Sequence, residues 1–103
     1  MRQSEEKFSR LFRLSPDSVT LAEAETGRIV DVNETFERHS GYRRDEAVGR
    51  TAAELGLYAD DTSRLAYLDL MARTGRVDNY EFEHKARDGA ITVCLLSSQT
   101  IDI

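Results

Sequence analysis

The sequence is short of the residues that build disulfides, metal clusters and membrane spans. It has one cysteine, one proline and no tryptophan. Cys94 by itself cannot form an internal disulfide or a cysteine-rich zinc site, so a reducing, cytoplasmic location is expected. No apolar run approaches the roughly 20 residues that cross a bilayer. The N-terminal stretch MRQSEEKFSR is amphipathic and carries two glutamates, unlike a secretory signal, so direct membrane insertion is not expected.

Clusters of basic residues are missing as well. The net charge is −5, the pI is near 5.0, and Arg43-Arg44 is only a pair. A nucleic-acid partner is therefore not expected. The 103 residues are 40% hydrophobic and 32% charged, which predicts one soluble α+β module with a single core.

The motifs of common enzyme classes are absent too. Neither a P-loop nor a dinucleotide-binding glycine motif occurs. Ser97 and Ser98 lack the glycine-rich elbow that exposes a nucleophilic serine. The paired carboxylates Asp60-Asp61 are better explained as a helix cap. The sequence predicts that this chain is not an enzyme.

The first third predicts a helix followed by a hairpin. Ser4 and the two glutamates after it favour a helix over Ser4–Leu14, whose apolar residues share one face. Alternating apolar residues predict a strand over about Asp17–Glu23. A turn at Thr26-Gly27 joins it to a second strand over Ile29–Val32.

A second helix is predicted directly after this hairpin. The side-chain oxygen of Asn33 can accept from the first N–H groups of the helix, and Gly41 can end it in a left-handed conformation. Phe36 and His39 lie three residues apart on one side of that helix.

Three further helices are predicted in the middle of the chain. They are a single turn over Asp45–Val48 ended by Gly49, a short helix with the capping box Thr51-x-x-Glu54, and a long helix from Asp60 or Asp61 to about Thr74 ended by Gly75. Leu65, Leu68 and Ala72 are expected to form the buried face of the long helix.

Two strands close the chain. Tyr80, Phe82 and His84 share one face of the first strand, and charged residues alternate with them. The run Ile91–Ser98 is apolar on both faces, which predicts a strand covered on both sides. Asp88-Gly89 lies in the turn between them.

The order of these features resembles the PAS domain family. The resemblance rests on Gly27–Gly49, GRIVDVNETFERHSGYRRDEAVG, and on Asp88-Gly89 between two strands about forty residues later. It implies an α+β fold in which helices flank a five-stranded antiparallel sheet. Residues 1–15 would then be a flanking helix and residues 16–103 the sensory domain. Only four strands are predicted, so the domain looks truncated or completes its sheet in an unusual way, with unpaired edges prone to self-association.

The resemblance also addresses cofactors. Flavin-binding light sensors of the family carry a reactive cysteine where this sequence has Ala52, and haem-binding relatives use a histidine on the long helix, which has none here. Neither haem nor a photochemically active flavin is expected, and no cofactor is predicted.

The resemblance places eight residues around a pocket between sheet and helices. These ligand-binding candidates are Phe36, His39, Leu68, Phe82, His84, Thr92, Cys94 and Leu96. A strict two-residue turn at Asp88-Gly89 would place His84 opposite Val93. A longer loop keeps Leu96 on the same face as Phe82 and is favoured.

His84 and Cys94 could share a zinc ion, but two ligands are too few for a structural site. The sequence therefore predicts no metal. It favours a partly buried histidine and a small cysteine in the core.

The function implied by the resemblance is sensory input. A small ligand would shift the domain between two conformations, and Ser4–Leu14 would relay the change to an output domain of the same polypeptide, a histidine kinase or a diguanylate cyclase. A homodimer is expected. The alternative is a ligand-free module for protein–protein interaction and dimerisation. A small-molecule-binding protein acting alone is a third reading.

Overall fold

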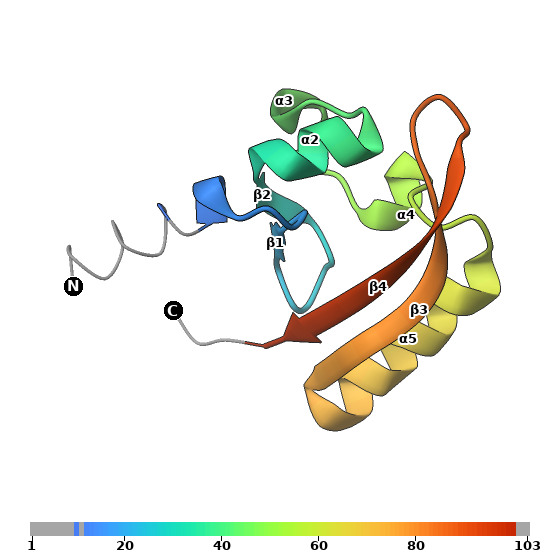
Figure 1. Cartoon of the computed structure of the whole chain (residues 1–103). Coiled ribbons are helices and arrows are strands. Elements are labelled where there is room, and N and C mark those ends of the chain that lie inside the picture. The colour runs from blue at the N-terminus through green and yellow to red at the C-terminus, as the bar shows by residue number, and fades with distance from the viewer. Residues whose placement is uncertain (1–9, 11, 101–103) are drawn as a thin grey trace. The chain divides into compact units, whose positions relative to one another are not determined.

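A computed structural model describes residues 10 and 12–100 of the chain. The labelled elements of the described residues follow in the order β1, β2, α2, α3, α4, α5, β3, β4 (Figure 1). This is the predicted α+β class. The chain divides into two compact units, Met1–Leu55 and Gly56–Ile103. Among the described residues, no helix has the length and apolar character needed to cross a membrane.

In the first unit, β1 (Thr20–Ala22) and β2 (Ile29–Val32) form an antiparallel hairpin. The second strand has its predicted bounds, whereas the first is shorter than the predicted Asp17–Glu23. The carbonyl of Val19 accepts from the Asn33 amide, but the amide of Val19 donates to the side-chain oxygen of Asn33 and not to a backbone carbonyl. The regular ladder therefore begins at Thr20, where a side chain takes over one of the two bonds of Val19.

Helix α2 (Glu34–Ser40) begins and ends as predicted. The Asn33 oxygen accepts from the amide of Phe36, and Gly41 ends the helix at φ 81°. A glycine suits this exit because residues with a Cβ rarely adopt such angles. Phe36 is 3% exposed and belongs to the core of the unit with Ile29 and Val32.

Two single-turn helices follow, α3 (Arg44–Ala47) and α4 (Ala52–Leu55). The predicted capping box at the start of α4 is confirmed: the Thr51 amide donates to the Glu54 carboxylate, and the Glu54 amide donates to the Thr51 hydroxyl. Both donors would otherwise lack a partner within the helix.

An ion pair ties β2 to α3. The Arg44 guanidinium donates to the carboxylate of Asp31, which also accepts from the Val32 amide. Burial by itself would raise the pKa of Asp31, but these hydrogen bonds outweigh it and hold the pKa below its ordinary value.

Replacing Asp31 with asparagine is therefore expected to lower the melting temperature at about pH 7 more than at about pH 3. A carboxyl group with a lowered pKa stabilises the fold above its unfolded pKa of about 3.9. That stabilisation is lost as the pH falls through the lower folded value. Thermal melts of both proteins at the two pH values measure it. Equal decreases in melting temperature at the two pH values would show that the ionised form of Asp31 does not stabilise the fold.

In the second unit, α5 (Asp61–Thr74) precedes a hairpin of β3 (Arg76–Lys85) and β4 (Ile91–Gln99). Asp60 caps the helix through the Ser63 amide, and Gly75 ends it, as predicted. Near its start the hairpin has an irregularity at Asn79, whose φ is 52° and whose amide donates to the Ser97 hydroxyl. Beyond this bulge the pairing is regular.

The predicted buried face of α5 is wrong. Leu65 is 55% exposed, Leu68 is 46% exposed, and Ala72 is exposed as well. Tyr67 turns toward β3 instead: its ring lies 6.0 Å from that of Tyr80. Leucine and alanine occur all around this helix, so apolar spacing alone did not identify the contact face.

The strands do not form the single sheet that the sequence predicts. Among the described residues, β1–β2 and β3–β4 are separate two-stranded sheets. No described strand hydrogen-bonds to both pairs, so nothing joins them into one ladder.

The predicted start of the N-terminal helix at Ser4 lies outside the described residues, and residues 10 and 12–14 are helical.

Candidate functional site

The candidate site in the second unit is one face of the β3–β4 hairpin, here called the α5 face. Its members are Tyr80, Phe82 and His84 on β3 and Thr92, Cys94 and Leu96 on β4. Side chains alternate between the faces of a strand, so these six side chains lie on one face of the hairpin. Helix α5 partly covers this face, because the ring of its Tyr67 lies 6.0 Å from that of Tyr80. Tyr67 of α5 donates from its hydroxyl to the Ser98 hydroxyl at the same face, 2.7 Å away.

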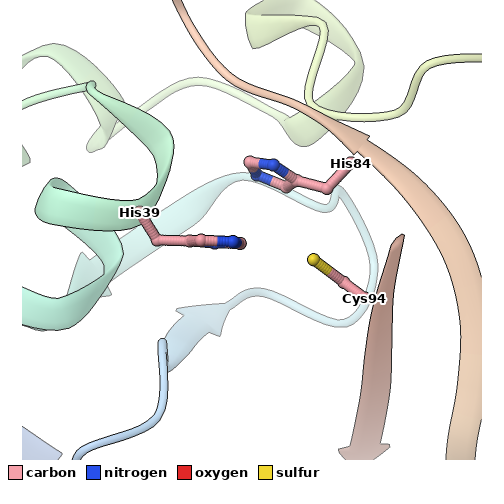
Figure 2. A group of neighbouring side chains, drawn as sticks. All are labelled: His39, His84 and Cys94. Carbon is pink, nitrogen blue, oxygen red and sulfur yellow. The ribbon is translucent and has the colours of Figure 1, made fainter. Parts of the chain in front are cut away.

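The register confirms the longer hairpin loop. His84 pairs with Thr92 and Phe82 with Cys94. The Ala86 amide donates to the Ala90 carbonyl, leaving three residues between them, and Gly89 takes φ 90°. A two-residue turn would have moved every β4 side chain to the other face. Figure 2 shows the result, with His84 projecting from β3 and Cys94 from β4.

Aromatic rings line much of the α5 face. The Tyr58 ring lies 4.8 Å from that of Phe82, and Phe82 meets His84 edge-on at 6.2 Å. Tyr58 is half-buried, and this burial raises the pKa of its hydroxyl. Apolar spacing in the sequence did not indicate that Tyr58 and Tyr67 belong to this face. The one indication in the sequence was its aromatic content, four tyrosines and no tryptophan, which makes tyrosine a candidate for aromatic contacts.

Two polar side chains lie within this aromatic surrounding. His84 is 7% exposed and Cys94 is half-buried. A ring nitrogen of His84 lies within 4.8 Å of the Cys94 sulfur. The Thr92 hydroxyl is 3.7 Å from the same sulfur, and Thr92 itself is exposed. The pair offers an imidazole and a thiol at one place on the hairpin.

The eight predicted site residues separate into three groups. Phe82, His84, Thr92, Cys94 and Leu96 share the α5 face. Leu68 is corrected, because its side chain is 46% exposed on α5.

The remaining two candidates belong to the first unit. Phe36 is buried there in the core. His39 lies on α2, where Figure 2 labels it, and is exposed.

An open hollow also occurs in the second unit, at the other end of the hairpin. It is lined by Arg76, Asp78, Ser97, Ser98 and Gln99. None of these is a predicted site residue, and the lining is polar. Ligand pockets are usually apolar with a few polar groups, so the α5 face fits that description better.

Comparison with known proteins gives a family match. The family described as the PAS domain matches residues 16–103. No curated protein sequence matches the chain significantly.

Solved structures share the fold. A domain of a sensory box sensor histidine kinase/response regulator from Geobacter sulfurreducens has 22% identity and a TM-score of 0.77, covering 95% of this chain and 84% of that one. The PAS domain of a protein from Colwellia psychrerythraea has 20% identity and a TM-score of 0.71, covering 87% and 75%. The PAS domain, in complex with ethanol, of a LuxR-family transcriptional regulator from Burkholderia thailandensis has 20% identity and a TM-score of 0.73, covering 92% and 83%.

Proposed function

The chain belongs to the PAS domain family, and we propose from this that it is the sensory input module of a larger signalling protein. Sensing and signalling are the general role of the family. The proposal adds that a small ligand binds at the α5 face and shifts the population of two conformations. A ligand does so only if it binds one conformation more tightly than the other. The change then reaches an output domain of the same polypeptide.

The observation that carries the ligand proposal is the composition of the α5 face. It places the nearly buried imidazole of His84 and the thiol of Cys94 beside the rings of Phe82 and Tyr58. A few polar groups within an apolar lining are what fixes the orientation of a small ligand. The complex of the similar Burkholderia thailandensis domain with ethanol supports a small molecule as the ligand.

A histidine kinase is the favoured output domain. The support is the similarity to a domain from a sensor histidine kinase/response regulator. A diguanylate cyclase is the other output implied by the sequence. Autophosphorylation of the parent protein, measured with and without the ligand, separates them.

Native mass spectrometry of the purified chain tests ligand binding. We expect a mass above that of the chain by one small molecule, which is lost on denaturation. Leu96→Gln, on the α5 face, should lose that molecule, and Leu95→Gln, on the opposite face, should keep it. If the purified chain carries no ligand, a set of small molecules is added and the native mass is measured again. A native mass that still equals that of the chain alone would contradict the proposal. The absorption spectrum should show neither a Soret band nor a light-induced flavin adduct, because the long helix has no histidine and Ala52 stands where the reactive cysteine would be.

A second function is supported by the opposite face of the hairpin, here called the open face. Its apolar members Ile91, Val93 and Leu95 are 55%, 67% and 65% exposed. The prediction that β4 is covered on both sides is therefore wrong for the described residues. A contiguous exposed apolar row is typical of an interaction surface. A dimerisation module would bury it against a second copy.

Replacing Val93 with lysine is expected to weaken self-association. The new charge lies in the middle of the open face, and Glu83 is directly opposite in the register, so the hairpin itself should tolerate it. Light scattering across a dilution series measures the mass. Leu65→Lys is the matched control, since Leu65 is similarly exposed but lies on α5. A strictly monomeric parent chain would exclude this function.

A further inference from the structure

We propose that His84 and Cys94 form a binding site for a monovalent copper ion. The two residues lie on neighbouring strands of one hairpin, and a ring nitrogen of His84 is within 4.8 Å of the Cys94 sulfur. Zinc bond lengths of about 2.3 Å to sulfur and about 2.0 Å to nitrogen give the scale: two ligands on opposite sides of one ion lie about 4.3 Å apart. The upper limit of 4.8 Å on the separation of the two ligand atoms is compatible with an ion held between them.

The ligand set selects the metal. A structural zinc ion takes four ligands, and the hairpin offers two. Copper(I) is a soft ion that prefers thiolate, and its filled d shell accepts a linear arrangement of only two ligands. A thiolate and an imidazole satisfy it without a third group.

The strand register supports the geometry. Cys94 pairs with Phe82 and His84 pairs with Thr92, so the imidazole and the thiol are diagonal neighbours on the same face. Such diagonal positions are within reach of long side chains. Because two strands of one hairpin carry both ligands, their backbones are held by the β3–β4 ladder before the ion arrives.

The sulfur is also accessible. Cys94 is only half-buried, and the neighbouring Thr92 is exposed. An ion can therefore reach the sulfur from the Thr92 side while His84, 7% exposed, supplies a shielded nitrogen. On binding, the thiol proton leaves to solvent and the sulfur–copper bond forms, with no change in oxidation state. Affinity should therefore rise with pH.

Anaerobic competition with the coloured complex of copper(I) and bicinchoninate tests the site on the whole chain. We expect the chain to withdraw one copper(I) ion per molecule. Changes to groups around a metal's ligands typically cost ~10–100-fold in affinity, so removing a ligand should cost at least about 100-fold. Cys94→Ser and His84→Gln should each show that loss. Glu83→Gln, which is next to His84 in sequence but exposed on the opposite face of the hairpin, should bind as the parent chain does.

A second measurement needs no variant and so does not depend on folding of the variants. X-ray absorption at the copper edge of the loaded parent chain should show a ligand shell of one sulfur and one nitrogen. A shell without sulfur, no uptake by the parent chain against the competitor, or uptake by either ligand variant equal to that of the parent chain would each overturn the inference. A chain that retains an organic ligand but takes no copper(I) overturns this site alone and leaves the proposed function standing.

Discussion

Replacing Asn33 with aspartate is expected to destabilise the first unit strongly. The Asn33 side chain is 2% exposed and makes four hydrogen bonds. Its oxygen accepts from the amides of Val19 and Phe36, and its nitrogen donates to the carbonyls of Phe12 and Asp17. Aspartate can keep both accepted bonds, which is why it is normally a good helix cap.

The loss comes from the donor side. A carboxylate has no N–H, so the carbonyls of Phe12 and Asp17 would face a buried negative charge and lose their partner. Leaving a buried polar group unsatisfied costs ~1–3 kcal/mol, and more when a charge is involved. We therefore expect a loss of about 3–5 kcal/mol, the range for breaking a buried charged network.

Urea denaturation followed by circular dichroism measures that loss. Asp60→Asn, at the exposed cap of α5, is the matched control, since the cap there only accepts hydrogen bonds and asparagine caps as well as aspartate. A near-parental midpoint for Asn33→Asp would show that the side chain acts as a cap alone.

Truncating Phe36 to alanine is the second large effect. Phe36 is 3% exposed and lies in the core formed with Ile29 and Val32. Removing a buried phenylalanine ring typically costs about 3–5 kcal/mol, enough to unfold a domain of ordinary stability. The free energy of unfolding in urea is the measurement.

Phe82→Ala provides the comparison. The family resemblance places Phe82 with Phe36 around one pocket, but the Phe82 side chain is only half-buried, and its ring lies 4.8 Å from that of Tyr58. Truncation at Phe82 should therefore cost less than truncation at Phe36, because less apolar surface is removed from the interior. Equal losses at the two positions would contradict the burial that distinguishes them.

The helix boundaries could be predicted because they depend on a few neighbouring residues. Asn33 and Asp60 cap through the amide three residues later, and Gly41 and Gly75 end helices at positive φ. The pairing of Thr51 with Glu54 is equally local. Side-chain chemistry and spacing in the sequence are sufficient for such features.

The contact faces could not be predicted because they depend on residues far away in the chain. On α5 the apolar residues are spread around the helix, and Tyr67 became the contact residue through Tyr80 and Ser98. The sequence of β4 is apolar on both faces, yet in the structure only the α5 face is partly covered by other residues. Asn33 was predicted as a helix cap, but its bonds to Phe12 and Asp17 cross 16 residues or more and left no signal in the pattern.

The hairpin register could be predicted in part. The sequence left two loop lengths open, and requiring Leu96 and Phe82 to share a face selected the correct one. The site residues on β3 and β4 followed from that choice. No comparable requirement determined which face of α5 is buried, so Leu68 was wrongly predicted to lie on the buried face.

The most direct test of ligand binding at the α5 face compares two adjacent leucines. Leu95 is on the open face and 65% exposed, whereas Leu96 is half-buried on the α5 face. Methyl NMR spectra of the chain with its retained small molecule, and after removal of that molecule by unfolding and refolding, record both side chains at once. The account predicts that the Leu96 methyl signals shift and the Leu95 signals do not. Shifts confined to Leu95, or identical spectra with and without the molecule, would contradict it.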